Sequence, residues 1–268
     1  MKHPSEEVEA VPDFPFQLRG VVEGFYGLFY TFPQRNELIR FLGRHGYNLY
    51  IYGPKNDYWH RERWWEPYPP EIMAQFEETA ALARQAGVTF CYSIAPGLSL
   101  RYGSEEDFRT LTAKLHAFYT HGIHSFSLLL DDIDPWLQHE MDLRRYRSHA
   151  HAQAEFCNRL YAWLNALDRS CTLSMCPTQY HGRAPFGEYL AELGESVHPE
   201  IDLFYTGPEI CAPTISTADV AAFAEVVRRP PLIWDNYLVN DLSRQPEMHL
   251  APMVGREPSL YRVAKGMV

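Results

Sequence analysis

The chain has 268 residues, of which 46% are hydrophobic and 22% charged, a composition typical of one soluble globular domain. Its net charge of −10, with no basic run, excludes a phosphate-binding surface of the kind that nucleic acids require. No uninterrupted apolar stretch is long enough to span a membrane, and the acidic, proline-rich start lacks the apolar segment of a signal peptide.

The five cysteines are odd in number and form no C-x-x-C pair. We therefore expect free thiols in a reducing compartment and predict a cytoplasmic protein. Residues 1–13 are predicted to be a flexible tail, and residues 14–268 a single catalytic domain.

Strand-like and helix-like segments alternate along residues 14–268, and each class is given in chain order. The strand candidates are Leu18–Tyr26, Asn48–Lys55, Val88–Pro96, Ser125–Asp132, Thr172–Thr178, Asp202–Glu209, Pro231–Tyr237 and a weaker Tyr261–Val268. The helix candidates are Pro33–His45, Pro69–Gln85, Ser104–His121, Ser148–Asp168, Phe186–Leu193 and Ser216–Arg228. Ser104 precedes three acidic residues, as a helix N-cap does, and Gly87 and Gly122 follow helix ends.

This alternation predicts a parallel sheet, and eight strand candidates favour a closed (β/α)8 barrel over an open sheet. No glycine-rich phosphate-binding loop follows the first strand, which further disfavours the open sheet. The sequence ends on the eighth strand candidate without its helix, so we expect a barrel that is incomplete or closed in an unusual way.

Polar residues gather where the predicted strands end. Glu23 to Tyr26 end the first, Pro54 to Asp57 the second, Asp131 to Asp134 the fourth, Thr178 to Tyr180 the fifth, and Trp234 to Asn236 the seventh. In a barrel these ends meet on one face, where catalytic groups of this architecture lie. The positions alone therefore predict an active site on that face.

The adjacent pair Asp131 and Asp132 is the main catalytic candidate. Successive side chains of an ideal strand point to opposite faces, so both carboxylates can face one pocket only if the strand ends at Asp131 and the backbone turns. The alternative is that one Asp caps a helix and the other is solvated. Asp134, before Pro135, is predicted to be a turn residue.

Two close carboxylates suit acid–base chemistry because ionising one raises the pKa of the other, so that one can hold a proton near neutral pH. Most glycosidases place their two carboxyl groups on opposite sides of the sugar bond, about 5–10 Å apart. Sequence neighbours suit a different mechanism, in which the acetamido oxygen of the substrate attacks. One Asp then orients that group while the other protonates the leaving oxygen.

At this point the motifs resemble the O-GlcNAcase family of glycoside hydrolases, family 84, which are retaining β-N-acetylglucosaminidases. The similar stretches are GVVEGFYG (Gly20–Gly27), YGPKNDYWHR (Tyr52–Arg61), SIAPGL (Ser93–Leu98), LLLDDID (Leu128–Asp134), CPTQY (Cys176–Tyr180), YTGPEI (Tyr205–Ile210) and WDNYLVND (Trp234–Asp241). They occur in the family's order and run through most of the chain.

The resemblance implies a role for each matching residue. Asp131 orients the 2-acetamido group for attack on the anomeric carbon, and Asp132 is the general acid and then the base. The other implied contacts with the sugar or its acetamido group come from Gly24 (through its carbonyl), Lys55, Tyr180, Asn236 and Asp241, with Cys176 and Trp234 as walls of the acetamido pocket. No metal and no cofactor are expected.

Each of these residues also has a structural interpretation. Lys55 is otherwise a solvated lysine, Tyr180 a packing residue, and Asn236 and Asp241 loop caps. Cys176 fits a small buried hydrophobe, and Trp234 fits the barrel core. One departure from the family is that its eighth strand runs into a further sugar-binding Asn, whereas here the sequence stops at Val268.

We predict a hydrolase of terminal β-linked N-acetylglucosamine (GlcNAc), acting on a GlcNAc-bearing glycan or on Ser and Thr of glycoproteins. One alternative is a hydrolase of other N-acetylhexosaminides, such as hyaluronan or mucin fragments. The other is an inactive GlcNAc-binding barrel, motivated by the missing Asn. No nucleic-acid or membrane partner is expected, and the sequence specifies no oligomeric state.

Overall fold

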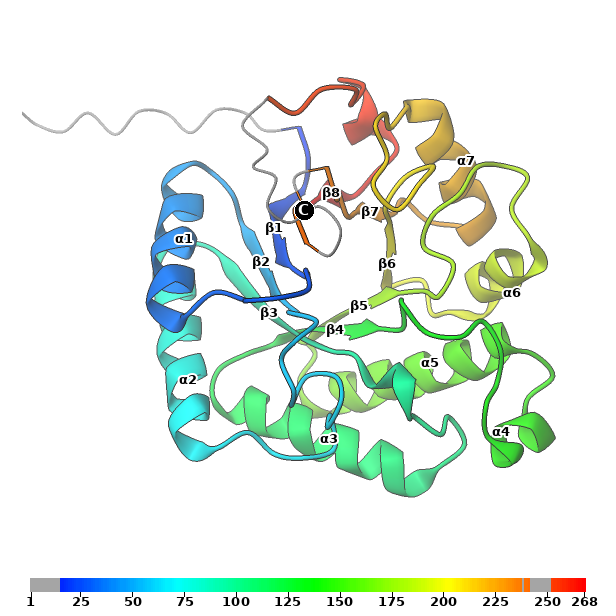
Figure 1. Ribbon diagram of the computed structural model, residues 1–268, viewed down its shortest axis with the longest axis horizontal. Helices are drawn as coiled ribbons and strands as arrows, with labels where there is room; N and C mark the ends of the chain where they lie inside the picture. The colour runs from blue at the N-terminus through cyan, green and yellow to red at the C-terminus, as the bar shows by residue number, and fades with distance from the viewer. Residues whose placement is uncertain (1–14, 238, 242–251) are drawn as a thin grey trace, which may run out of the picture.

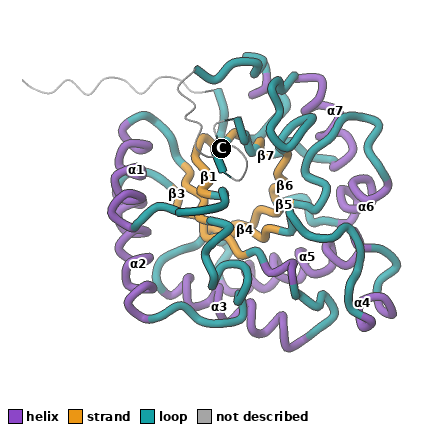
Figure 2. The backbone as a smooth tube through the Cα atoms, viewed as in Figure 1, coloured by secondary structure: helices purple, strands orange, loops and turns teal. Residues whose placement is uncertain are grey.

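The computed structural model describes residues 15–237, 239–241 and 252–268. The tail predicted over residues 1–13 lies outside them. Eight parallel strands form a closed barrel in the order β1 to β8, so the predicted fold class is confirmed. The strands make a central ring that the helices surround (Figures 1 and 2).

The elements follow one another as the sequence alternation predicts. The strands are β1 Leu18–Glu23, β2 Leu49–Tyr52, β3 Thr89–Ile94, β4 Ser125–Leu129, β5 Thr172–Cys176, β6 Asp202–Tyr205, β7 Leu232–Ile233 and β8 Gly266–Met267. The helices are α1 Phe32–Arg44, α2 Pro70–Gln85, α3 Glu105–Thr120, α4 Glu140–Arg145, α5 His149–Leu167, α6 Glu188–Ser196 and α7 Thr217–Val227, with short 3₁₀ turns at Pro96–Leu98 and Leu260–Arg262.

The barrel closes through regular parallel pairing of its first and last strands. Leu18 pairs with Gly266 and Arg19 with Met267, while β8 also pairs with β7. The expectation of an incomplete or unusually closed barrel is therefore wrong. No α-helix lies between β7 and β8 in the part of this connection that the structure describes.

Several predicted strands are too long at their carboxyl ends. β4 ends at Leu129, where the sequence predicted Asp132, and most of the eighth candidate is a 3₁₀ turn followed by a two-residue strand. The short helix α4 was not predicted at all. A parallel strand ends where the neighbouring strand no longer provides backbone N–H and C=O groups for pairing. The apolar composition of the sequence does not indicate that position.

Two predicted helix signals are confirmed. The Ser104 side chain accepts a hydrogen bond from the Asp107 N–H (3.2 Å) and so caps α3. Gly87 and Gly122 follow α2 and α3 with φ of +71° and +79°, which an L side chain adopts only with strain.

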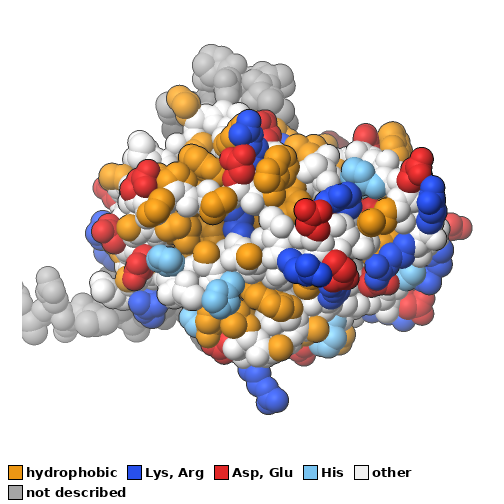
Figure 3. Space-filling view, turned by 90° about the horizontal axis from the view of Figure 1, so that it is seen from below, with side chains coloured by type: hydrophobic (Ala, Val, Ile, Leu, Met, Phe, Trp, Pro, Cys, Tyr) orange, Lys and Arg blue, Asp and Glu red, His pale blue; other side chains and the backbone are white. Residues whose placement is uncertain are grey.

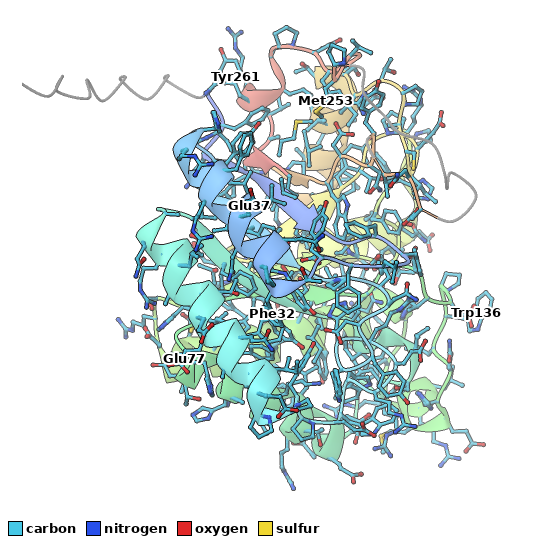
Figure 4. The ribbon with its side chains drawn as sticks, turned by 60° about the vertical axis from the view of Figure 1, so that its left-hand side comes forward. Phe32, Glu37, Glu77, Trp136, Met253 and Tyr261 are labelled. Atoms are coloured by element: carbon cyan, nitrogen blue, oxygen red, sulfur yellow. The ribbon has the colours of Figure 1, made fainter. Side chains whose placement is uncertain are left out.

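Apolar side chains form two layers of core. An inner layer fills the barrel and includes Leu49, Ile51, Leu129 and Phe204. A larger outer layer joins the helices to the strands; in it Phe32 of α1 meets Phe76 of α2 edge to face at 5.1 Å. Figure 4 shows these two helices side by side, with Trp136 projecting at the opposite edge of the molecule.

The surface over the lower helices of Figure 1 carries acidic and basic side chains interspersed, without a large patch of either sign (Figure 3). Among the described helices, none combines the length and the apolar character that crossing a bilayer requires.

A buried ion pair joins β1 to α1. Arg35 of α1 donates through Nε to Oε2 of Glu23 (2.8 Å) and through Nη2 to Oε1 (3.0 Å), while the Tyr50 hydroxyl donates to Oε2 (2.5 Å). Arg35 is 1% exposed and Glu23 is fully buried. Burial lowers the pKa of Arg35, but the hydrogen bonds and charge of Glu23 outweigh it and hold that pKa above its ordinary value.

We predict that Arg35→Met lowers the free energy of unfolding by about 3–5 kcal/mol, because it leaves the Glu23 carboxylate buried without its cation. Arg144→Met is the matched control, since the Arg144–Glu140 pair is 80% and 84% exposed, and we expect little or no change there. Urea denaturation of both variants checks this. Equal losses in the two variants would contradict the structural weight that we give to the Glu23–Arg35 pair.

Candidate active site

A cavity of about 300 Å³ opens at the carboxyl ends of the barrel strands. All nine site residues predicted from the sequence line it. They are Gly24, Lys55, Asp131, Asp132, Cys176, Tyr180, Trp234, Asn236 and Asp241. Segments separated by more than 200 residues in the chain thus meet at one place, since parallel strands direct all their carboxyl ends to one face.

The turn after β4 brings both carboxylates of the Asp pair to this cavity. The strand ends at Leu129, three residues before the predicted end at Asp132, and Asp132 takes up a left-handed backbone conformation with φ of 52°. Asp tolerates this conformation better than most residues with a side chain. The expected turn of the backbone is therefore present, but it lies at Asp132.

Lys55, from the segment after β2, lies between the two acids. Its ammonium group donates to Oδ2 of Asp131 in a short contact and lies 3.6 Å from Oδ2 of Asp132. Lys55 is 6% and Asp131 8% exposed. Burial lowers the pKa of Lys55, but the charge of Asp131, and then that of Asp132, raise it more, so the net shift is upward. The solvated-lysine interpretation of Lys55 is wrong.

Asp132 receives hydrogen bonds on both carboxylate oxygens. Tyr26 donates to Oδ2 (2.8 Å) and Tyr180 to Oδ1 (3.0 Å). Burial raises the pKa of Asp132, but the charge of Lys55, the two phenol hydrogen bonds and the charge of Arg61 together outweigh it and hold that pKa below its ordinary value. The shift of the Asp132 pKa in this arrangement is therefore opposite in direction to the one expected from a close carboxylate pair.

Asp131 differs from Asp132 in having an unused acceptor. Its Oδ2 is engaged by Lys55, whereas the buried Oδ1 accepts no hydrogen bond from any described residue. A buried carboxylate oxygen without a donor is costly in a folded protein. Asp131 can thus accept an N–H or O–H from a molecule in the cavity.

The wall opposite the acids is formed by close packing of Gly24 and Trp234. A Cβ atom on Gly24 would lie 2.2 Å from Cζ2 of the Trp234 ring, so only glycine fits beside this indole. Cys176, at the end of β5, is buried among apolar groups, and that burial raises the pKa of its thiol well above the ordinary value. Trp234 also packs within the inner core, so the core and cavity-wall interpretations of this residue both hold.

Asn236 and Asp241 lie on the segment after β7. The Asn236 side-chain amide donates to the Ile210 carbonyl (2.9 Å), and Asp241 Oδ2 accepts the Tyr26 N–H (2.8 Å). Each side chain is thereby held at the cavity by a hydrogen bond to a neighbouring loop, as the loop-cap interpretation predicts. Its remaining polar atoms are available to a ligand.

Other polar strand ends have structural partners and lie outside the cavity lining. Glu23 pairs with Arg35, and Asp235 forms a two-point ion pair with Arg256 (both contacts 2.6 Å). Asp57 accepts hydrogen bonds from two buried tyrosines and from the Trp59 N–H. Polar residues at the strand ends thus serve both the cavity and the structure around it.

Sequence reasoning gave no role to several residues that contribute to the site. Tyr26 follows Gly24 by two positions in the GFYG stretch, and Arg61 ends the stretch that contains Lys55. Arg61 donates to the Tyr26 hydroxyl (3.0 Å) and to the Asp132 carbonyl (3.3 Å). Their positions on the two matching loops are the signal that could have identified them. Thr206, Ile210, Cys211 and Val239 complete the cavity lining.

Among the residues that the structure describes, no three His, Cys, Asp or Glu side chains gather in a way that could hold a metal ion. The cavity offers instead three carboxylates, one ammonium group and two phenols. This set can transfer a proton and orient a polar, uncharged ligand.

We predict that Gly24→Ala displaces the Trp234 ring, because no side chain fits at that distance, and lowers the free energy of unfolding by about 1–3 kcal/mol. Gly187→Ala is the matched control, since a Cβ there meets nothing within 4 Å, and its effect should lie roughly within 0.5 kcal/mol. Urea denaturation followed by tryptophan fluorescence measures both effects. An unchanged denaturation midpoint for Gly24→Ala would show that the Trp234 ring moves aside without cost, which contradicts the prediction.

Comparison with known proteins agrees with this geometry. Residues 19–268 match the sequence model of the beta-N-acetylglucosaminidase family. The protein O-GlcNAcases of Rattus norvegicus and Mus musculus are each 36% identical over 259 residues, which is 94% of this chain and 27% of theirs. The chain thus spans about a quarter of the length of these relatives.

A solved structure is also similar. A mutant of the Thermobaculum terrenum O-GlcNAc hydrolase superimposes with a TM-score of 0.92 at 38% sequence identity, over 95% of this chain and 55% of that one. The family match covers residues 19–268, a range that contains the turn after β4. The chain therefore belongs to the beta-N-acetylglucosaminidase family of glycoside hydrolases.

Proposed function

We propose that this domain hydrolyses terminal β-linked N-acetylglucosamine with retention of configuration, through attack by the substrate's own acetamido oxygen. The observation that carries this proposal is the turn after β4, which presents Asp131 and Asp132 to one cavity with Lys55 between them. Family membership supports the sugar.

The placement of the acids favours an internal nucleophile. Both carboxylates lie on one turn, so they approach a bound sugar from one side, whereas two-carboxylate retaining enzymes need groups on either side of the bond. In the first step the acetamido carbonyl oxygen bonds to the anomeric carbon, the bond to the leaving oxygen breaks, and Asp132 protonates that oxygen. In the second, Asp132 takes a proton from water, which attacks the anomeric carbon and opens the oxazoline.

Asp131 supports this attack through the acetamido N–H. Its unused Oδ1 is a buried acceptor. When the acetamido N–H donates to this oxygen, the amide becomes richer in electrons, and its carbonyl oxygen is a better nucleophile. Lys55 fixes Asp131 in place by engaging its other oxygen.

The remaining predicted residues are proposed to bind the sugar. The Gly24 carbonyl, Asn236 and Asp241 hold hydroxyl groups, and Cys176 with Trp234 encloses the acetamido methyl group. Tyr180 is proposed to contact the acetamido or oxazoline oxygen; its hydroxyl here donates to Asp132, so it can exchange between the two.

A bound sugar must also raise the pKa of Asp132, because the general acid has to carry a proton. Excluding water from the cavity has this effect, since it disfavours the charged form, and so does diverting the hydroxyl of Tyr180 or Tyr26 to the sugar. Substrate binding and proton uptake by Asp132 are then coupled.

The proposed substrate is N-acetylglucosamine on Ser or Thr of proteins, and the relatives are named for that activity. We also propose a cytoplasmic location, because all five cysteines, each in a described range, are free thiols. No nucleic-acid or membrane partner is proposed.

The test compares two leaving groups. Asp132→Asn should lower kcat by about 10³-fold for an alkyl N-acetylglucosaminide, which needs a proton donor, and by less than about 10-fold for a dinitrophenyl one. Asp131→Asn should slow both substrates alike, since it acts on the nucleophile. Equal losses for both substrates in Asp132→Asn would remove Asp132 from the acid role.

The wild-type protein decides between the alternatives. Release of N-acetylglucosamine from a glycosylated peptide supports the proposal, while faster release from hyaluronan or mucin fragments supports the other hydrolase. Measurable binding of the free sugar with no release above background supports an inactive binding barrel.

The pH profile gives an independent prediction. Tyr26→Phe removes a hydrogen bond that favours ionised Asp132, so the pKa of Asp132 rises. The protonated, productive form then persists to higher pH. The alkaline limb of the kcat/KM profile should therefore shift to higher pH by about one pH unit. Tyr58→Phe is the control, because Tyr58 has no described contact with Asp132. A limb that stays in place or moves to lower pH contradicts the role given to Tyr26.

A further inference from the structure

The turn that presents the two acids is held from behind, at the residue just before them. The Leu130 N–H donates to the Cys176 carbonyl (2.9 Å), and the Leu130 carbonyl accepts from the Thr178 hydroxyl (2.8 Å). Both backbone groups of Leu130 are therefore tied to the segment that ends β5. This tie fixes where the chain leaves the sheet before the left-handed Asp132.

Thr178 belongs to a closed ring of hydrogen bonds with Tyr189 of α6 and Gln153 of α5. The Thr178 N–H donates to the Tyr189 hydroxyl (3.0 Å), which donates to Oε1 of Gln153 in a short contact. Nε2 of Gln153 donates to the Thr178 hydroxyl (2.8 Å). Gln153 is fully buried and does not line the cavity.

The donor and the acceptor of each hydrogen bond in this ring are fixed. A backbone carbonyl can only accept, so the Thr178 hydroxyl must donate to Leu130 and accept from Gln153. A backbone N–H can only donate, so the Tyr189 hydroxyl must accept from Thr178 and donate to Gln153. Glutamine supplies both the acceptor and the donor that this order requires. Its donor occupies the acceptor site of the Thr178 hydroxyl, which leaves the hydroxyl proton to the Leu130 carbonyl.

We propose that Gln153, acting through Thr178, is a positioning residue for the Asp131–Asp132 turn. This inference rests on the proposed function and adds residues that touch no substrate. A left-handed backbone is strained for a residue with a side chain, so the turn persists only where its surroundings determine it. The ring supplies that determination on the side of the turn away from the cavity.

The main test replaces the Thr178 hydroxyl. Thr178→Val keeps the shape of the side chain but removes the donor to the Leu130 carbonyl and one acceptor of Gln153 Nε2. The other contacts of that nitrogen are His149 Nε2 (3.0 Å) and the Tyr102 hydroxyl (3.1 Å). We expect kcat for an aryl N-acetylglucosaminide to fall by about 10- to 100-fold, with KM changed by less than about 3-fold, because the acids are displaced relative to the bound sugar. Thr178→Ser, which keeps the donor, should restore kcat to within about 3-fold of wild type.

The matched control is Thr79→Val in α2. Thr79 is fully buried, whereas Thr178 is half-buried, and the Thr79 hydroxyl donates to Oδ1 of Asn36 (2.8 Å) between α1 and α2. We expect both valine variants to lower the melting temperature and only Thr178→Val to lower kcat. A Thr178→Val variant with wild-type kcat, or a serine variant as slow as the valine one, overturns the proposal.

A second variant tests the hydrogen-bond ring while keeping a polar side chain at position 153. Gln153→Glu can donate to Thr178 only while its carboxyl is protonated, so its activity relative to wild type should fall as pH rises through the pKa of that carboxyl. A ratio to wild type that is constant with pH overturns the proposal, and this arm decides where Thr178→Val does not fold.

Crystal structures of the same variants separate this inference from the proposed function. If wild type shows no turnover, the proposed function fails, and the backbone of Asp132 still decides the positioning role. A Thr178→Val structure in which Asp132 has left φ near 52° supports the role, and an unchanged turn overturns it.

Discussion

The left-handed backbone of Asp132 is the constraint on which this site depends. Consecutive residues of an extended strand direct their side chains to opposite faces, and here two consecutive acids reach one cavity because the chain turns between them. The turn lies directly after a fully buried strand end, so it needs partners for its backbone and its charges. Leu130 supplies the backbone anchor and Lys55 the charge.

The acids at the strand ends fall into two groups according to how their oxygens are used. Glu23 and Asp235 have partners for both carboxylate oxygens, from Arg35 and Arg256 respectively. Asp131 keeps a buried oxygen without a described donor. The first group stabilises the barrel ends, whereas the unsatisfied oxygen carries a standing cost that a ligand can relieve. Accounting for every acceptor therefore marks Glu23 and Asp235 as structural acids and Asp131 as an acid that can still bind a ligand. It does not distinguish Asp132, whose two oxygens both accept phenol hydrogen bonds.

The closed barrel was predictable from sequence because alternating buried strands and capped helices leave few other architectures. The site was predictable for a related reason: Lys55, Asp131 and Asn236 all follow strands, and a barrel brings those points together. The ends of β4 and β8 were not predictable, since they depend on which backbone groups the neighbouring strand offers. Whether Cys176 and Trp234 face the cavity, the core or both depends on packing that only the assembled structure specifies.

The protonation of Asp132 could not be predicted for a deeper reason. From sequence, the nearest charge is Asp131, which raises the pKa of its neighbour. In the folded protein Lys55 and Arg61 arrive from a segment more than 70 residues away. Their charges, together with two phenol hydrogen bonds, outweigh the effect of burial and lower the pKa of Asp132. The sign of a pKa shift belongs to the assembled site and not to a motif.

The charges at the cavity also bear on what it can hold. Two acids at the turn are faced by Lys55 and by Arg61, so positive and negative groups nearly balance there. A ligand with a net charge at this point would leave one of these groups uncompensated in a poorly hydrated space, at a cost that grows as water is excluded. On the proposed function, a neutral sugar would avoid that cost, and its amide N–H would meet Oδ1 of Asp131, a buried acceptor without a described donor. A sugar that excludes water and engages the tyrosine hydroxyls would also raise the pKa of Asp132, so that substrate binding would favour protonation of the acid that the reaction requires.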